Sequence, residues 1–166
     1  MSRRMNHRMN HRMNNSLGRL AIPAVAAVAL LLGGVAAHAQ GSPLGLWKTI
    51  DDKTGKEKSL VRIGEAGGVL SGKVEKLLDP ARQGALCEHC EGDDKDKPIA
   101  GMTIIRGVKQ SADDAQLWDG GRILDPVDGK SYKVRLKPID GGARLEVRGY
   151  VGTPLLGRTQ TWTRVE

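Results

Sequence analysis

From about residue 40 onward, the chain is built of short runs in which hydrophobic and polar residues alternate. A period of two is typical of β-strands with one buried face, and no segment of this region keeps a helical period for three turns. Aspartate, glycine and proline cluster between the runs, as expected for tight turns. The pattern predicts eight strands, over residues 44–50, 58–65, 68–78, 100–109, 115–124, 130–138, 143–151 and 157–165.

The clearest predicted hairpin joins "YKVRLKP" to "ARLEVRGYV" through "IDGG". Both arms alternate strictly, so one face is apolar and the other charged, as in an antiparallel sheet that is wet on one side. A fold at "IDGG" predicts three opposed pairs: Leu136 with Leu145, Val134 with Val147, and Arg135 with Glu146.

These strands predict an all-β fold. Eight short strands joined by tight turns favour a small antiparallel up-and-down β-barrel, because closure leaves no strand edge exposed. A β-sandwich is the alternative architecture.

The first 39 residues have the features of a cleavable signal peptide. An acid-free basic stretch, residues 1–19, precedes an apolar run from Leu20 to Val35, and "AHA" then places Ala37 and Ala39 at a cleavage site. The run has 16 residues, fewer than the roughly 20 that span a bilayer. We therefore expect cleavage near Ala39, delivery to the periplasm or the exterior, and no membrane span in the mature chain. "SRR" near the start is a weaker indication of a twin-arginine signal.

Removal of the leader changes the charge of the chain. The whole sequence carries +7 at pH 7, with 26 basic and 19 acidic residues. Five arginines and no acid lie in the leader, so residues 40–166 carry 21 basic and 19 acidic residues, about +2. The high pI therefore gives no support for nucleic-acid binding. The 127 residues that remain suffice for a single domain.

The segment "ALCEHCEGDDKDKP" concentrates the candidate chemistry of the mature chain. It holds both cysteines, Cys87 and Cys90, and in an oxidising compartment two thiols predict one disulfide. A redox centre would need a βαβ setting and a helix amino-terminus, and zinc would need a fourth ligand besides His89 and the two thiols. We therefore expect a structural disulfide, no metal and no cofactor.

The acidic residues of the same segment raise the question of calcium. They are Glu88, Glu91, Asp93, Asp94 and Asp96. The spacing lacks the glycine of an EF-hand loop, and two lysines interleave with the acids. A solvated surface loop over residues 79–98 is the favoured interpretation, and its unusual length is typical of a functional or flexible element.

Arginine and aromatic residues of the last strands are candidate ligand-binding residues. Arg158, Gln160, Trp162 and Arg164 share one face of the last strand, and Arg148 precedes them, with Lys133 and Arg135 nearby. They could bind an anion, or the arginines could solubilise an exposed sheet face. Alternation alone does not say which face lines the barrel.

Catalysis finds little support in the sequence. The mature chain contains one histidine, which lies in the acidic loop, so a Ser-His-Asp arrangement would depend on it. "GKEKS" and "DGKSY" lack the other elements of a phosphate-binding loop. We do not expect an enzyme.

Several stretches resemble a family of small exported bacterial proteins known only as domain of unknown function 2147. They are "GLWKT…DDKTGKEKSLVRI", "CEHCEGDDKDKPIAGM" and "GGRILDPVDGKSYKVRL…LEVRGYVG…LLGRTQTWTRV", which together cover about residues 45–165. Leu156 departs from the pattern, where an aromatic residue is expected before "GRTQ".

The chain is also similar to lipocalin-like barrels, in which a G-x-W on the first strand packs against an arginine on the last. Gly45, Leu46 and Trp47 match the first part, with Arg164 the better candidate for the arginine and Arg158 the alternative. Such stacking would close one end of the barrel.

This resemblance implies a binding module for a small amphipathic or apolar ligand, such as a lipid. The residues expected to take part are Trp47, Tyr132, Arg148, Arg158, Gln160, Trp162 and Arg164. The alternative is an envelope structural or interaction protein whose barrel is filled by side chains. The sequence does not indicate the oligomeric state.

Overall fold

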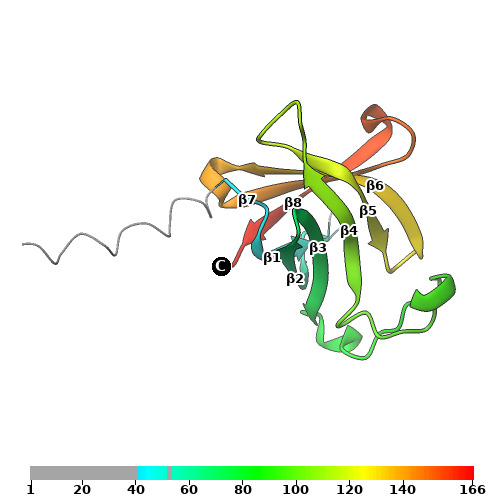
Figure 1. Ribbon diagram of the computed structural model, residues 1–166. Helices are drawn as coiled ribbons and strands as arrows, with labels where there is room; N and C mark the ends of the chain where they lie inside the picture. The colour runs from blue at the N-terminus through cyan, green and yellow to red at the C-terminus, as the bar shows by residue number, and fades with distance from the viewer. Residues whose placement is uncertain (1–40, 52–53) are drawn as a thin grey trace, which may run out of the picture. The chain divides into compact units, whose positions relative to one another are not determined.

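The computed structural model describes residues 41–51 and 54–166, which form a closed barrel of eight antiparallel strands (Figure 1). Each strand pairs with its neighbours in sequence, and β1 pairs with β8 to close the ring. The predicted all-β class and up-and-down barrel are confirmed, and the sandwich is not formed. The predicted signal peptide, residues 1–39, lies outside the described residues.

All eight predicted strands are present, with ends that differ from the prediction by three residues at most. They are β1 Gly45–Ile50, β2 Glu57–Ala66, β3 Val69–Leu77, β4 Thr103–Gln110, β5 Trp118–Asp125, β6 Lys130–Ile139, β7 Arg144–Tyr150 and β8 Gly157–Arg164. Four single 3₁₀ turns interrupt the connections: η1 Pro80–Arg82, η2 Gly92–Asp94, η3 Asp140–Gly142 and η4 Pro154–Leu156. Within the described residues, no helix is long and apolar enough to cross a membrane.

The predicted pairing of β6 with β7 is wrong by two residues. Leu136 lies opposite Val147 and Arg135 opposite Arg148, whereas Leu145 faces Pro138. The loop is wider than a two-residue turn because Asp140, Gly141 and Gly142 all have positive φ, at 52°, 65° and 90°. Glycine adopts this conformation without strain, and aspartate tolerates it better than most residues. A shift of two preserves the alternation, so the apolar face of the hairpin is the predicted one.

Alternation along the strands places one face of each strand inside the barrel. Inward-facing residues that are almost completely buried include Trp47, Val61, Ile63, Leu70, Val108, Val134, Leu136, Leu145, Val147 and Trp162. On β8, Trp162 is buried while Thr161 and Thr163 are exposed. The face of β8 that carries Arg158, Gln160, Trp162 and Arg164 is therefore the inner one.

The two ends of the barrel are built from different connections. The β2–β3, β4–β5 and β6–β7 turns lie at one end, together with residues 41–44 and the last two residues, and we call it the closed end. The connections β1–β2, β3–β4, β5–β6 and β7–β8 lie at the other end, which we call the mouth. In Figure 1 the C-terminus and the β6–β7 turn are on the left, and the β3–β4 and β7–β8 connections are on the right.

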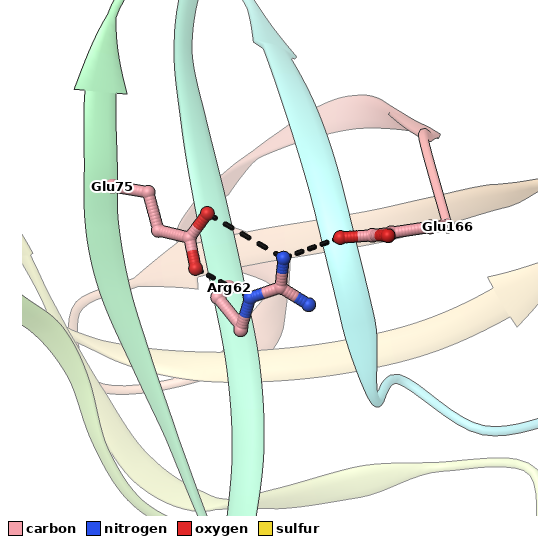
Figure 2. Close-up of polar contacts among 3 residues, drawn as sticks. All are labelled: Arg62, Glu75 and Glu166. Atoms are coloured by element: carbon pink, nitrogen blue, oxygen red, sulfur yellow. Dashed lines mark hydrogen bonds and ion pairs between the residues drawn. The ribbon is translucent and has the colours of Figure 1, made fainter.

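An ion cluster on the outer surface ties the C-terminal residue to the barrel wall. Figure 2 shows the Arg62 guanidinium of β2 between the carboxylates of Glu75 on β3 and Glu166. The hydrogen bond to Glu75 raises the pKa of Arg62 above its ordinary value most strongly, and the hydrogen bond to Glu166 adds to the effect. Because all three side chains are exposed, we expect the cluster to contribute little to stability.

Candidate ligand-binding site

The closed end is sealed by Arg164 stacked on Trp47. The guanidinium carbon lies 4.2 Å from the ring centroid of the fully buried indole. Arg164 donates hydrogen bonds to the carbonyl oxygens of Ser42 and Leu44, each at 2.7 Å, and of Gly142, at 2.6 Å. The stacking predicted between the first and last strands is confirmed, and Arg164 rather than Arg158 makes it.

Burial also affects the ionisation of Arg164 in this Arg164–Trp47 stack, which we call the plug. It lowers the pKa of Arg164 from its ordinary value, but an arginine begins so high that the guanidinium stays charged at neutral pH. The Trp47 indole N–H donates to the Pro43 carbonyl at 2.7 Å. Three chain segments are therefore held together by side chains whose polar groups are satisfied by backbone oxygens.

Gly45 allows the chain ends to approach closely at this plug. It has φ +125°, and a Cβ placed there would lie 2.4 Å from the Glu166 carbonyl oxygen and 2.7 Å from Arg164 Nη1. The backbone N–H of Leu46 donates to that same carbonyl at 2.9 Å. The glycine of the G-x-W motif is thus required by the close passage of the last residues.

The mouth, in contrast, opens into a cavity of about 520 Å³ inside the barrel. Side chains from every strand line it, and the apolar ones dominate its walls. They are Val74, Leu77, Ile99, Ile104, Ile123, Leu124, Pro126, Val127, Val147, Val151, Leu155, Leu156 and Trp162. Gly149 also faces this space, where a larger residue would fill part of it.

Polar groups of the cavity lie mainly near its mouth. Lys58, Arg82, Asp125, Asp128 and Arg158 line the entrance from different connections and strand ends. Because β8 runs from the mouth to the closed end, Gln160 and Trp162 lie deeper than Arg158, and the Trp162 indole N–H donates to Gln160 Oε1 at 3.1 Å.

Tyr132 is fixed at the entrance by its hydroxyl, which donates to Asp128 Oδ2 at 2.8 Å. The hydrogen bond to Asp128, with burial and the negative charge of Asp125, raises the pKa of Tyr132. The phenol therefore remains a hydrogen-bond donor at neutral pH.

One polar pair lies within the wall. The hydroxyls of Thr49 and Ser59 are buried and share a hydrogen bond of 2.8 Å. Both line the cavity and were not among the residues predicted for the site. Alternation could have identified them. Thr49 lies two residues after Trp47 and Ser59 two residues before Val61, so each shares the inner face of its strand.

The predicted site residues separate into three groups. Four of them line the cavity: Tyr132, Arg158, Gln160 and Trp162. Trp47 and Arg164 belong to the plug at the closed end. Arg148 points outward, where its Nε donates to the Pro154 carbonyl and its Nη1 to Thr159 Oγ1, each at 2.7 Å.

The predicted disulfide between Cys87 and Cys90 is present, and both residues are buried. The β3–β4 connection that contains it, residues 78–102, packs against the β5–β6 turn. Cys87 Sγ lies 3.5 Å from the Pro126 carbonyl oxygen, and a Cβ at Gly129 would lie 1.8 Å from the His89 carbonyl oxygen. Since Pro126 and its neighbours line the cavity, the disulfide loop supports one side of the mouth.

The acids of this loop do not gather around a common centre. Within residues 41–51 and 54–166, no group of three or more His, Cys, Asp or Glu side chains is placed to hold a metal ion. Asp94 instead accepts from Arg106 Nη2 of β4, at 3.1 Å, which fastens the loop to the barrel wall.

Comparison with known proteins agrees with this architecture. Residues 45–164 match the family model described as "Uncharacterized protein conserved in bacteria (DUF2147)". A solved structure, described as protein HP1028 from the human pathogen Helicobacter pylori that belongs to the lipocalin family, superimposes with a TM-score of 0.66. The two chains are 20% identical over 75% of this chain and 84% of the other, a likeness that shows the fold alone. No curated protein matches the sequence.

Proposed function

Because this chain belongs to the DUF2147 family and folds as a lipocalin-like barrel, we propose that it is a binding module for a small amphipathic or apolar ligand. The observation that carries the proposal is the cavity of about 520 Å³ at the mouth. Pockets for small molecules usually measure roughly 300–1,000 Å³ and are mainly apolar with a few polar groups.

The distribution of polarity supports an amphipathic ligand. The wall is mainly aliphatic, whereas ionisable groups collect at the entrance. An apolar tail would displace water from the wall, and a polar head would remain near Tyr132 and Arg158 at the entrance.

Two features favour binding over the alternatives. A barrel that acts only as a structural element would be filled by its own side chains, whereas this one is filled only in its closed half. The lining is mainly apolar, as in ligand pockets, and its ionisable groups come from different connections and strand ends. We therefore propose a non-catalytic role without a cofactor.

The proposal includes export. The basic stretch, apolar run and "AHA" of residues 1–39 support delivery to the periplasm or the exterior. Amino-terminal sequencing of the protein recovered outside the cytoplasm should begin at Gln40. Recovery of the whole chain in the cytoplasm would contradict this part.

A cavity-filling substitution tests the ligand. Gly149 has no positive φ, and a Cβ there makes ordinary contacts of 3.6–3.7 Å with Tyr132 and Ile123. Gly149→Val should reduce the affinity for a fluorescent fatty-acid probe at least about tenfold, because added methyl groups occupy the cavity. The probe is titrated while its emission is recorded.

Gly64→Val is the matched control, since Gly64 is also a strand glycine but its Cβ would meet nothing within 4 Å. Native mass spectrometry of the purified protein should show an apolar compound that organic extraction releases. Failure of the wild-type protein to bind the probe or retain any such compound would overturn the proposal.

A further inference from the structure

Four apolar side chains form an exposed rim around the mouth, which we call the apolar rim. They are Val127 of the β5–β6 turn and Val151, Leu155 and Leu156 of the β7–β8 loop. Leu155 is 89% exposed and Leu156 75% exposed. Contiguous apolar surface of this kind usually marks an interaction site.

The leucines are presented by a braced loop. Pro154 begins the η4 turn that carries both of them. Arg148 Nε donates to the Pro154 carbonyl at 2.7 Å, and its Nη2 to the Leu155 carbonyl at 3.5 Å. The hydrogen-bonded backbone of the loop therefore holds the side chains of Leu155 and Leu156 exposed to solvent.

A group of cations covers the outer wall below this loop. The cationic wall consists of Arg122 on β5, Lys133 and Arg135 on β6, and Arg148 on β7. Arg122 lies directly opposite Lys133, and Arg135 directly opposite Arg148. Like charges in opposed positions destabilise a sheet, and of the four cations Arg148 has the evident structural role of bracing the β7–β8 loop.

Acidic side chains neutralise this wall only in part. Among the ion pairs of the described residues, its one partner is Asp119, 3.6 Å from Arg135 Nε. The acidic β3–β4 loop lies across the mouth from the β7–β8 loop, since these connections are half the barrel apart in strand order. Apolar and cationic surface thus meet at the β7–β8 loop, whereas the acidic loop lies beside the β5–β6 turn that carries Val127.

We propose that the mouth docks on an anionic lipid bilayer, with the apolar rim entering the interface and the cationic wall contacting headgroups. Basic residues flanking exposed apolar ones are the combination that binds such surfaces. Protruding leucines need a shape-matched pocket on a protein partner, whereas a fluid bilayer adapts to them. When the β7–β8 leucines enter the lipid first, the acidic loop lies on the opposite side of the mouth from them. The rim residues also line the cavity, but docking on a bilayer goes beyond the proposed ligand binding.

Flotation with vesicles tests the docking. The full chain should bind vesicles of phosphatidylglycerol mixed with phosphatidylcholine, and bind pure phosphatidylcholine much more weakly. Leu155→Ser with Leu156→Ser should weaken binding roughly tenfold or more, because the two side chains proposed to be buried in the bilayer are lost. Val165→Ser, at the closed end and 50% exposed, is the matched control and should change nothing.

The charge contribution is tested separately. Arg122→Gln with Lys133→Gln should weaken binding roughly fivefold per removed charge and reduce its salt dependence. Lys73→Gln with Lys109→Gln removes two exposed cations from β3 and β4, outside the cationic wall, and should have a smaller effect.

Hydrogen exchange separates docking at the mouth from lipid binding by the apolar leader. Added vesicles should protect residues 151–156 and leave residues 85–98 unchanged. Bound vesicles without protection of residues 151–156, equal binding to neutral vesicles, or unchanged binding of the leucine variant would each overturn the proposal. So would a wild-type dimer that the leucine variant converts to monomer, because a second copy would then cover the rim.

Discussion

The closed end and the mouth are made from the same eight strands but satisfy their polar groups in different ways. At the closed end, Arg164 donates hydrogen bonds to three backbone carbonyls and stacks on the Trp47 ring. At the mouth, side chains such as Tyr132 and Asp128 pair with one another beside open space. The first arrangement fills the barrel, and the second leaves a cavity.

This difference indicates that stability and binding are located at opposite ends. Core packing and satisfied buried groups at the closed end resist opening of the chain. Around the cavity the mouth lacks such packing and can exchange water for a ligand. Substitutions at the two ends should therefore have different consequences, and four of them test the separation.

The largest effect is expected for Arg164→Ala. Its loss leaves three carbonyls without their donor and exposes Trp47, which should lower the free energy of unfolding by about 3 kcal/mol. Denaturant unfolding measures this. Arg158→Ala, on the same inner face of the same strand but at the mouth, should cost less than about 1 kcal/mol. Equal losses in the two variants would contradict the assignment of stability to the closed end.

Gly129→Ala is expected to have the next largest effect. Its Cβ would lie 1.8 Å from the His89 carbonyl oxygen, and φ is +71°, so the disulfide loop must move away from the β5–β6 turn. We expect a loss of about 2 kcal/mol by thermal or denaturant unfolding.

Gly55→Ala separates the effect of a Cβ clash from the effect of backbone strain at positive φ. Gly55 has φ +68°, in the β1–β2 connection at the same end, but its Cβ would meet nothing within 4 Å. It should cost only about 1 kcal/mol. If the two alanine variants were equally stable, the packing of the loop on the turn would be unimportant.

Removal of the disulfide should have a smaller and local effect. The bridge closes only four residues, for which chain entropy gives about 2 kcal/mol at most. Cys87→Ser with Cys90→Ser should accelerate hydrogen exchange in residues 78–102 and 126–129 while the closed end stays protected. Faster exchange around Trp47 would show that the two ends are not separate.

The smallest effect is expected for Tyr132→Phe and depends on pH. The raised pKa means that the folded state holds the phenolic proton more tightly than the unfolded chain. The stabilisation is complete below the ordinary tyrosine pKa of about 10 and is lost as pH rises through the raised value.

Tyr132→Phe should therefore be slightly less stable than wild type at neutral pH, and the difference should vanish at alkaline pH. Asp128→Asn weakens the hydrogen bond and removes the charge through which Asp128 raises the pKa of Tyr132, so it should reduce the alkaline dependence, as followed by denaturant unfolding at several pH values. A pH-independent difference for Tyr132→Phe would contradict the role of Asp128.

The strands and the plug were predictable from sequence because they depend on local alternation and on a motif. Arg164 was preferred to Arg158 as the partner of Trp47, and the structure confirms it. The β6–β7 register was not predictable, because three consecutive positive-φ residues widen the turn beyond two residues. Alternation fixes the face of a residue, but its partner depends on loop geometry.

The site itself was only partly predictable. Alternation placed Arg158, Gln160 and Trp162 on one face without saying that this face is internal. Whether the barrel is filled depends on how side chains from all eight strands meet, which no local pattern encodes. Arg148 illustrates the limit, since its bonds to Pro154 exist only because the β7–β8 loop folds back over it.

The pairing of β1 with β8 has a consequence for the order of events during synthesis. A chain that emerges amino-terminus first presents β1 long before β8, so one edge of β1 stays unpaired while the intervening strands appear. Unpaired edges are sites of aggregation, and contacts between distant segments form slowly. Because Arg164 and Glu166 complete the ring, we expect that the barrel closes only after almost the whole domain has emerged, and that a chain truncated before β8 remains in need of a chaperone.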